Sequence, residues 1–348
     1  MPPDHRPDEL SAAILRALLY ADLFDFPMHA HEIHRQLLLM QASLADVQRH
    51  LNDDPWLGDK MERTGDLYHL HGRGALCAHR ARQEHGTDAL IAQHITVLRL
   101  LTLIPYVRMV AFSGGTSRKN SIQDNDLDLF IVAEKGRAWT VYALMITLAR
   151  VLGCREVLCA NYLVDRVHVA VPDGGDLFTG HELMALRPLV GEAWLQHMVD
   201  NNRWVAQLMP NASSREREQL WRALPVEPLL RRGLELGLWP QWWLVERGSR
   251  ALLGRRIRNK AAAIGDADVL LRPGILKLHT SDNRGLIVTR YRDALERFGL
   301  LERRFDEVLG KRLRKRKAGP NHAETARDTA VGRQGVRRAD PTAVARHE

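Results

Sequence analysis

Two aspartates, Asp126 and Asp128, stand on either side of Leu127 at the start of an apolar run. Successive side chains of a β-strand point to opposite faces, so both carboxylates are expected on one face, about 7 Å apart along the backbone. Neighbouring carboxylates repel each other, and a divalent cation that prefers oxygen ligands, such as Mg²⁺, would compensate them. The spacing therefore predicts a metal site with Asp126 and Asp128 as its ligands.

The residues before the aspartates suit an anion. Gly114 and Gly115 lack Cβ atoms, so their backbone N–H groups can approach a ligand closely. The expected nucleotide-binding residues are Ser113, Gly114, Gly115, Thr116, Ser117, Arg118 and Lys119. The alternative is a hairpin in which the run 124–126 closes a turn through side-chain bonds to its own backbone. That alternative leaves the paired glycines and Asp128 unexplained, so we expect the loop to hold a triphosphate.

The pattern consists of Ser113-Gly114-Gly115, a ten-residue gap and Asp126-Leu127-Asp128-Leu129. Over about residues 107–133 it resembles the signature of the DNA polymerase beta-type nucleotidyltransferase superfamily. The stretches LLYADLFDFPM, NYLVD, DLFTGHEL, NNRWVAQLMPN and LKLHTSDNRG are similar to uncharacterised bacterial proteins that join a helical N-terminal module to a minimal nucleotidyltransferase domain. The resemblance implies that the glycines position a nucleoside triphosphate, with ATP the first expectation, and that the aspartates bind two Mg²⁺ ions. It implies transfer of a nucleoside monophosphate to an unknown hydroxyl acceptor with release of pyrophosphate.

The chain departs from the superfamily pattern in two places. It has Lys119 where the loop commonly continues with a glycine, and it has Asn161 where a third carboxylate is expected on a later strand. If side chains alternate along 157–164 and beyond, Asp165 joins the face of Cys159 and Asn161, so Asp165 is the candidate third ligand or general base. The alternative is a domain that has lost catalysis and kept nucleotide binding.

The surrounding pattern predicts an α+β fold with a small mixed-sheet nucleotidyltransferase core. A long helix over 75–103 is expected to end at Ile104-Pro105. Beyond it, the periodicity predicts strands at 107–112 and 127–133, a helix at 137–152, and a strand pair at 157–164 and 166–171.

The first seventy residues show three apolar stripes at helical spacing, the third entered through Ser43, and then a strand-like hairpin at 57–62 and 66–70. Three helices followed by a hairpin resemble a winged helix-turn-helix. The third helix offers Arg49 and His50 among three aspartates, so packing or partner docking is preferred to DNA binding. The alternative function is a non-catalytic, nucleotide-sensing regulatory or scaffold protein whose winged module contacts DNA or protein.

Five parts are expected along the chain: a winged-helix-like module at 1–73, a connector helix at 74–104, the nucleotidyltransferase core at 105–175, a helical region at 176–310 and a basic disordered tail at 311–348. Thr179 and Glu182 fit a capping box at the start of the helical region. His279, Asp282 and Arg284 suggest a phosphate contact, with capping by Ser281 or Asp282 as the alternative.

The net charge of +8 is concentrated in the tail, where eleven Lys or Arg residues against four acidic residues give +7. Such a tail predicts contact with RNA, or else a solvated segment without a specific partner.

No apolar stretch is long enough to span a membrane and the N-terminus lacks a signal layout, so we expect a cytoplasmic protein without a membrane partner. Cys77, Cys154 and Cys159 are interpreted as small buried apolar residues.

Overall fold

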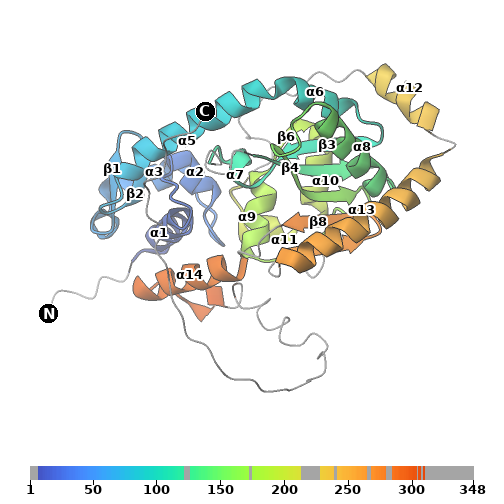
Figure 1. Ribbon diagram of the computed structural model, residues 1–348. Coiled ribbons are helices and arrows are strands. Elements are labelled where there is room, and N and C mark those ends of the chain that lie inside the picture. The colour runs from blue at the N-terminus through green and yellow to red at the C-terminus, as the bar shows by residue number, and fades with distance from the viewer. Residues whose placement is uncertain are drawn as a thin grey trace, which may run out of the picture.

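A computed structural model describes residues 7–120, 126–171, 175–212, 228–238, 241–264, 268–279, 284–303, 305–306 and 309. It confirms the α+β class: a mixed sheet in the strand order β6-β3-β4-β5-β8-β7 lies among helices (Figure 1). Only β4 and β5 run parallel; the other neighbouring strands are antiparallel. The strands are β3 Val107–Phe112, β4 Leu127–Ala133, β5 Leu158–Asp165, β6 Arg187–Val190, β7 Asp268–Arg272 and β8 Ile275–His279.

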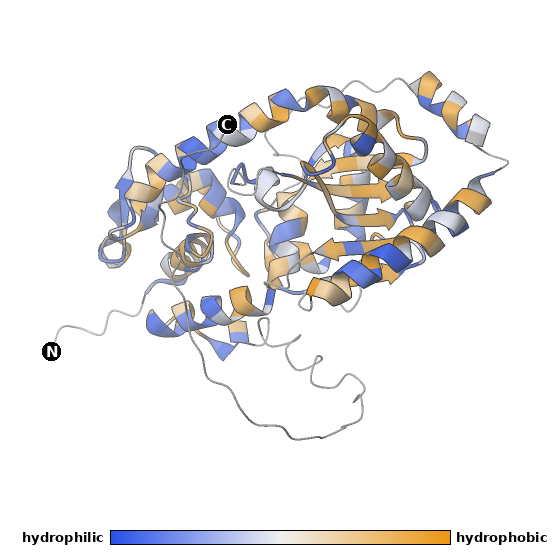
Figure 2. Ribbon diagram, in the orientation of Figure 1, coloured by the Kyte–Doolittle hydropathy of each residue, from blue (hydrophilic) through white to orange (hydrophobic). Residues whose placement is uncertain are grey.

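Helices cover both faces of the sheet because its central strands are apolar on both sides (Figure 2). One face packs against α6 (Ile95–Leu103) and α8 (Ala138–Val151), with α13 (Trp242–Ile264) against α8. The other packs against α9 (Leu177–Ala185), α10 (Glu192–Asn201) and α11 (Trp204–Leu208). In β4, Leu129 and Ile131 enter the α6/α8 core and Val132 enters the α9 core. Side-chain alternation thus places Asp128 on the α9 face.

The sheet extends beyond the core predicted at 105–175. Strands β6, β7 and β8 come from the region expected to be helical, so the boundary at 175 is wrong for the sheet. These strands are short, and periodicity over so few residues does not separate strand from helix. The strand expected at 166–171 is absent, because the chain turns directly after β5. The strands at 107–112 and 127–133 have their predicted bounds.

The N-terminal region contains three helices, α1 Glu9–Asp22, α2 Ala30–Arg35 and α3 Leu44–Asp53, followed by a hairpin of β1 Met61–Thr64 and β2 Leu67–Leu70. The first strand of the hairpin lies later than the predicted 57–62, because Pro55–Gly58 form the short helix α4. Ser43 caps α3, its hydroxyl accepting a hydrogen bond from the Asp46 N–H at 3.1 Å. The predicted helix over 75–103 is two helices, α5 (Ala75–Gln93) and α6, separated at His94.

The C-terminal helix α14 (Arg284–Arg297) returns to the N-terminal helices (Figure 1). The Tyr291 hydroxyl donates to the Arg16 carbonyl of α1 at 3.0 Å, and the Arg16 guanidinium donates to the Leu300 carbonyl at 3.1 Å. Residues of the predicted parts 1–73 and 176–310 therefore share one hydrophobic core. The predicted basic tail at 311–348 lies outside the described residues.

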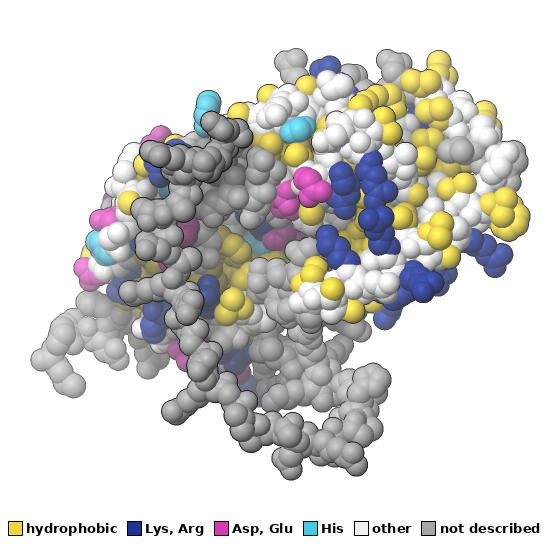
Figure 3. All heavy atoms as spheres, in the orientation of Figure 1, with side chains coloured by type: hydrophobic (Ala, Val, Ile, Leu, Met, Phe, Trp, Pro, Cys, Tyr) yellow, Lys and Arg dark blue, Asp and Glu magenta, His cyan; other side chains and the backbone are white. Residues whose placement is uncertain are grey.

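The described residues also form a local basic surface. Lys and Arg side chains gather over the half of the molecule that carries the sheet (Figure 3). Helix α13 contributes exposed basic side chains, namely Arg247, Arg250, Arg255, Arg256, Arg258 and Lys260. Of the helices described, none has both the length and the hydropathy needed to cross a bilayer.

Candidate active site

Three neighbouring strands bring Ser113, Asp128 and Cys159 into one row. Ser113 directly follows β3, and its N–H donates to the Asp128 carbonyl on β4 at 3.0 Å. Asp128 is in register with Cys159 on β5. Side chains directly opposite one another on neighbouring strands share a face of the sheet, so all three extend toward the α9 side.

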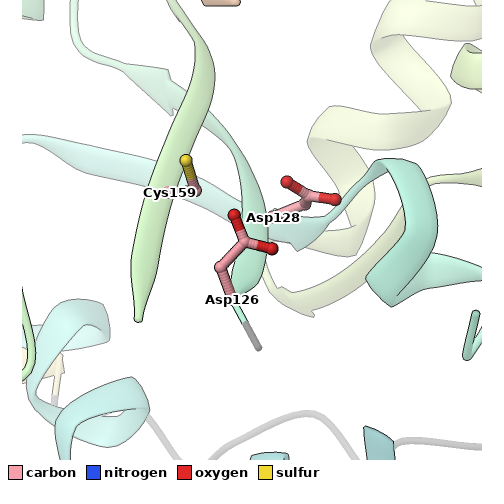
Figure 4. Close-up of side chains that lie close together, drawn as sticks. All are labelled: Asp126, Asp128 and Cys159. Atoms are coloured by element: carbon pink, nitrogen blue, oxygen red, sulfur yellow. The ribbon is translucent and has the colours of Figure 1, made fainter. Parts of the chain in front are cut away.

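Asp126 completes this group from the position just before β4. Ligand atoms of Asp126, Asp128 and Cys159 all lie within 4.8 Å of one another. Figure 4 shows the two carboxylates side by side next to the thiol of the adjacent strand. The sheet thus places the two predicted metal ligands together and adds Cys159, which the sequence analysis assigned to packing.

The two carboxylates repel each other. Burial, together with the charge of Asp126, raises the pKa of Asp128 to about 7. Hydrogen bonds from the Asn161 side-chain amide and from the Gly115 N–H, the latter at 3.2 Å, act in the opposite direction without cancelling the rise. A cation between the carboxylates would remove the cause of repulsion, which is the behaviour expected of a metal site.

Gly114 makes the closest approach to this site. Its φ is +51°, in the left-handed region, and a Cβ atom there would lie 2.6 Å from Asp128 Oδ2. Gly114 and Gly115 open the short helix α7 (Gly114–Ser117). The hydroxyl of Ser113 is buried and, within the described part of the chain, has no hydrogen-bond partner. Ser113, Gly114 and Gly115 therefore line the site beside Asp128.

Thr116 and Ser117, predicted to surround an anion, instead hold the loop in place. Both are fully buried. The Thr116 hydroxyl accepts from the Asp128 N–H at 2.9 Å, and the Ser117 hydroxyl donates to the Gly114 carbonyl at 2.9 Å. These bonds fix the glycines against β4, so the two residues position the site and do not line it.

The two loop cations are engaged by protein carboxylates. Arg118 pairs with Glu182 of α9 at 2.8 Å, and Lys119 pairs with Asp88 of α5 at 2.9 Å. This arrangement does not favour the predicted contact of Arg118 and Lys119 with phosphate, because each side chain already has a carboxylate as its counter-ion. Lys119 has a φ of +54°, a conformation that glycine adopts at less cost.

The capping box predicted from Thr179 and Glu182 is wrong. Asp176 is the N-cap of α9, and its carboxylate accepts from the Thr179 N–H at 2.8 Å. Glu182 is therefore available to Arg118, whose guanidinium also donates to the Gly114 carbonyl at 3.2 Å. The Arg118–Glu182 pair thus ties the glycine loop to α9.

We expect Glu182→Gln to destabilise the protein by about 2 kcal/mol, because it leaves the largely buried Arg118 cation without its counter-ion. The measurement is the denaturant midpoint, with Glu296→Gln on the exposed face of α14 as the matched control. Equal midpoints for Glu182→Gln, the control and the unmodified protein would show that the pair does not hold the loop.

Asp165 does not belong to this site, which corrects the prediction of a third catalytic carboxylate. It is in register with Ala133 at the far end of β4, whereas Cys159 is in register with Asp128. Asp165 lies six residue steps along the strand from Cys159, roughly 20 Å. A register shift at Asn161 also breaks the alternation on which the prediction depended.

Asp165 has a local structural role. It accepts hydrogen bonds from the Gly136 N–H at 3.0 Å and contacts the His168 Nδ1 at 2.6 Å, fixing the turn after β5. The predicted phosphate contact near 279–284 is likewise unsupported: Arg284 lies 3.6 Å from the Asp176 carboxylate, and Ser281 and Asp282 lie outside the described residues.

Sequence reasoning missed Cys159 and Glu182 for separate reasons. Cys159 has no local motif, and only the pairing of β4 with β5 places it opposite Asp128. Glu182 was assigned to helix capping from its local sequence, so its ion pair with Arg118 was not predicted. The alternation of Leu158, Cys159 and Ala160, ahead of the register shift, was the available signal for Cys159.

Comparisons of the chain with protein-family models, with curated proteins and with solved structures found no match.

Proposed function

We propose that this chain is a divalent-metal-dependent nucleotidyltransferase that moves a nucleoside monophosphate from a nucleoside triphosphate to a hydroxyl acceptor. The observation that carries the proposal is the approach of Asp126 and Asp128 beside the Cβ-free backbone of Gly114. Carboxylate oxygens at this separation fit a divalent cation such as Mg²⁺. The resemblance of the sequence to the polymerase beta-type signature supports the same chemistry.

The residues of the chain have separate roles in this reaction. Asp126 and Asp128 would hold the metal, which when bound acidifies the acceptor hydroxyl and stabilises negative charge on the triphosphate. The backbone at Gly114 and Gly115 and the Ser113 hydroxyl would contact the phosphates. The acceptor hydroxyl loses its proton to solvent and its oxygen forms a bond to the α-phosphorus, while the bond from that phosphorus to the oxygen bridging to the β-phosphate breaks, releasing pyrophosphate.

The test is calorimetric binding of the four ribonucleoside triphosphates, with Mg²⁺ present and absent, accompanied by an assay for pyrophosphate. We expect binding, with ATP examined first, to require the metal and to fall at least about 100-fold in Asp126→Asn, because a metal ligand is lost. Asp200→Asn, which changes an exposed carboxylate on α10, is the matched control. Metal-independent binding, or equal binding by both variants, would contradict the proposal.

The second candidate is the nucleotide-sensing regulatory or scaffold protein. It is supported by contacts between the loop and two earlier parts of the chain: the Asn120 amide donates to the Phe24 carbonyl, directly after α1, at 3.0 Å, and Lys119 pairs with Asp88 of the connecting helix α5. Nucleotide binding at the loop would then be transmitted to the N-terminal module. Triphosphate binding without pyrophosphate release across a panel of hydroxyl acceptors would favour this candidate.

The surface of α3 gives little support to DNA as the regulated partner. Arg49 is the basic residue on its exposed face, and it pairs with Asp46 at 2.8 Å. Transfer to an RNA end is a variant of the enzymatic proposal, in which the basic tail contacts the RNA. Strongly salt-dependent RNA binding that is lost on truncation at Lys311 would support that variant.

A further inference from the structure

We infer that Cys159 is a third protein ligand at this site and that the site prefers a thiophilic divalent ion, of the Zn²⁺ or Co²⁺ kind, to Mg²⁺. The inference concerns the metal of the proposed active site, but metal binding can be measured whether or not transfer occurs. It begins from the donor set: two carboxylates and one thiol whose ligand atoms lie within 4.8 Å of one another.

The sheet fixes this donor set. Asp128 and Cys159 are paired in the parallel β4–β5 ladder, so their side chains share a face. The register shift after Leu129 lies beyond this pair and leaves it intact, and Asn161 donates its amide to Asp128 Oδ1. That bond orients the carboxylate beside the thiol. Zinc binds sulfur at about 2.3 Å and carboxylate oxygen at about 2.1 Å, so its ligand atoms must lie roughly 3.5 Å apart. The three groups, within 4.8 Å of one another, must move closer by about 1 Å when the ion binds.

The Ser113 hydroxyl is an independent indication that a ligand belongs here. The residue is 8% exposed, and its Oγ has no hydrogen-bond partner in the described part of the chain. Because Ser113 bonds to the Asp128 carbonyl across the β3–β4 pair, its side chain shares the face of Asp128. A buried hydroxyl without a partner is costly. A metal-bound water or a phosphate oxygen would satisfy it.

Ligand chemistry decides between the ions. Thiolates favour Zn²⁺, Co²⁺ and Cd²⁺, whereas Mg²⁺ prefers oxygen donors and retains its waters. Binding would convert the Cys159 thiol to a thiolate and release one proton, because the thiolate is the ligand form. The proton passes to solvent, and the hydrogen bond that the thiol donates to the Asp126 carboxylate in the metal-free site is lost.

The experiment is titration of the full-length, metal-free protein with Co²⁺, followed by the thiolate-to-cobalt charge-transfer absorption in the near ultraviolet. We expect the band in the unmodified protein, its loss in Cys159→Ser, and a Co²⁺ affinity at least about tenfold lower in that variant. Cys77→Ser is the control, because it removes a thiol of similar exposure on α5 and keeps Cys159. Cys159→Asp replaces the thiol by a carboxylate, so the metal preference of the site should shift from Co²⁺ toward Mg²⁺. Misfolding would weaken the binding of both ions and so would not produce this shift.

The outcomes are distinct from those of the transfer assay. A band retained in Cys159→Ser, or absent from the unmodified protein, would overturn the inference even if Mg²⁺-dependent transfer were observed. A Cys159-dependent band in a protein that neither binds nucleotide nor releases pyrophosphate would support the inference and reject the proposed function. The thiolate band also separates this site from cobalt bound to surface histidines, which lack sulfur.

Discussion

Asp128→Asn should abolish nucleotidyl transfer and at the same time stabilise the metal-free protein. We expect activity to fall at least about 100-fold, because a ligand to the metal is lost. Stability should rise because Asp128 is held beside Asp126 in a partly buried position, where burial and the neighbouring charge raise its pKa to about 7. Keeping this carboxyl ionised in the fold costs at most about 4 kcal/mol, at about 1.4 kcal/mol per pKa unit.

The gain in stability should depend on pH. The carboxyl binds its proton more tightly in the folded than in the unfolded protein, so its contribution to stability is full below pH 4 and is lost as pH rises to about 7. The asparagine side chain of the variant does not titrate and has no such dependence. The difference in free energy of unfolding between the variant and the unmodified protein should therefore be small at pH 4.5 and reach its maximum above pH 7.

At pH 8 we expect Asp128→Asn to raise the free energy of unfolding by about 1–2 kcal/mol, which is less than the upper bound of about 4 kcal/mol. The gain is smaller because asparagine has one acceptor oxygen where aspartate has two, so the hydrogen bond from the Gly115 N–H can be lost. The measurement is the denaturant midpoint of both proteins at pH 5 and pH 8 without added metal, with Asp200→Asn as control. Addition of metal should reverse the order, since only the unmodified site gains from binding. A gain at pH 5 that equals the gain at pH 8 would contradict the electrostatic explanation.

The central hairpin of the site was predictable because its determinants are local. Alternation along 127–133 gives the strand and the shared face of Asp126 and Asp128, and the glycine pair gives the close approach. The same local reasoning failed for Asp165, because a register shift at Asn161 interrupts the alternation along β5. A sequence pattern carries no sign of such a bulge unless its pairing strand is known.

Contacts between residues far apart in the sequence could not be predicted, for a related physical reason. Cys159 reaches the aspartates only because β5 lies parallel to β4 after a helical crossover, and strand register is set by tertiary packing. Arg118 and Lys119 looked like phosphate contacts because their partners, Glu182 and Asp88, lie far away in the sequence. Charged residues in a polar loop are therefore weak predictors of ligand contact until their counter-ions are known.

Gly114→Ala should disable the site without removing any ligand group. Its φ of +51° is strained for alanine by about 1 kcal/mol. The added Cβ would also lie 2.6 Å from Asp128 Oδ2, so either the loop or the carboxylate must move. We expect metal and nucleotide affinity to fall at least about 100-fold, because a displacement near 1 Å at reacting groups has effects of that size.

Gly153→Ala separates the clash from the strain. Gly153, between α8 and β5, has a φ of +66°, but a Cβ added there would meet no neighbouring atom within 4 Å. Both variants should lose about 1 kcal/mol of stability from the left-handed backbone, and only Gly114→Ala should lose metal affinity, measured by calorimetry. If the two variants bound metal equally well, the close approach of Gly114 to Asp128 would not be a requirement of the site. Because both glycines carry the same backbone penalty, any difference in binding between them reports the contact with the Asp128 carboxylate.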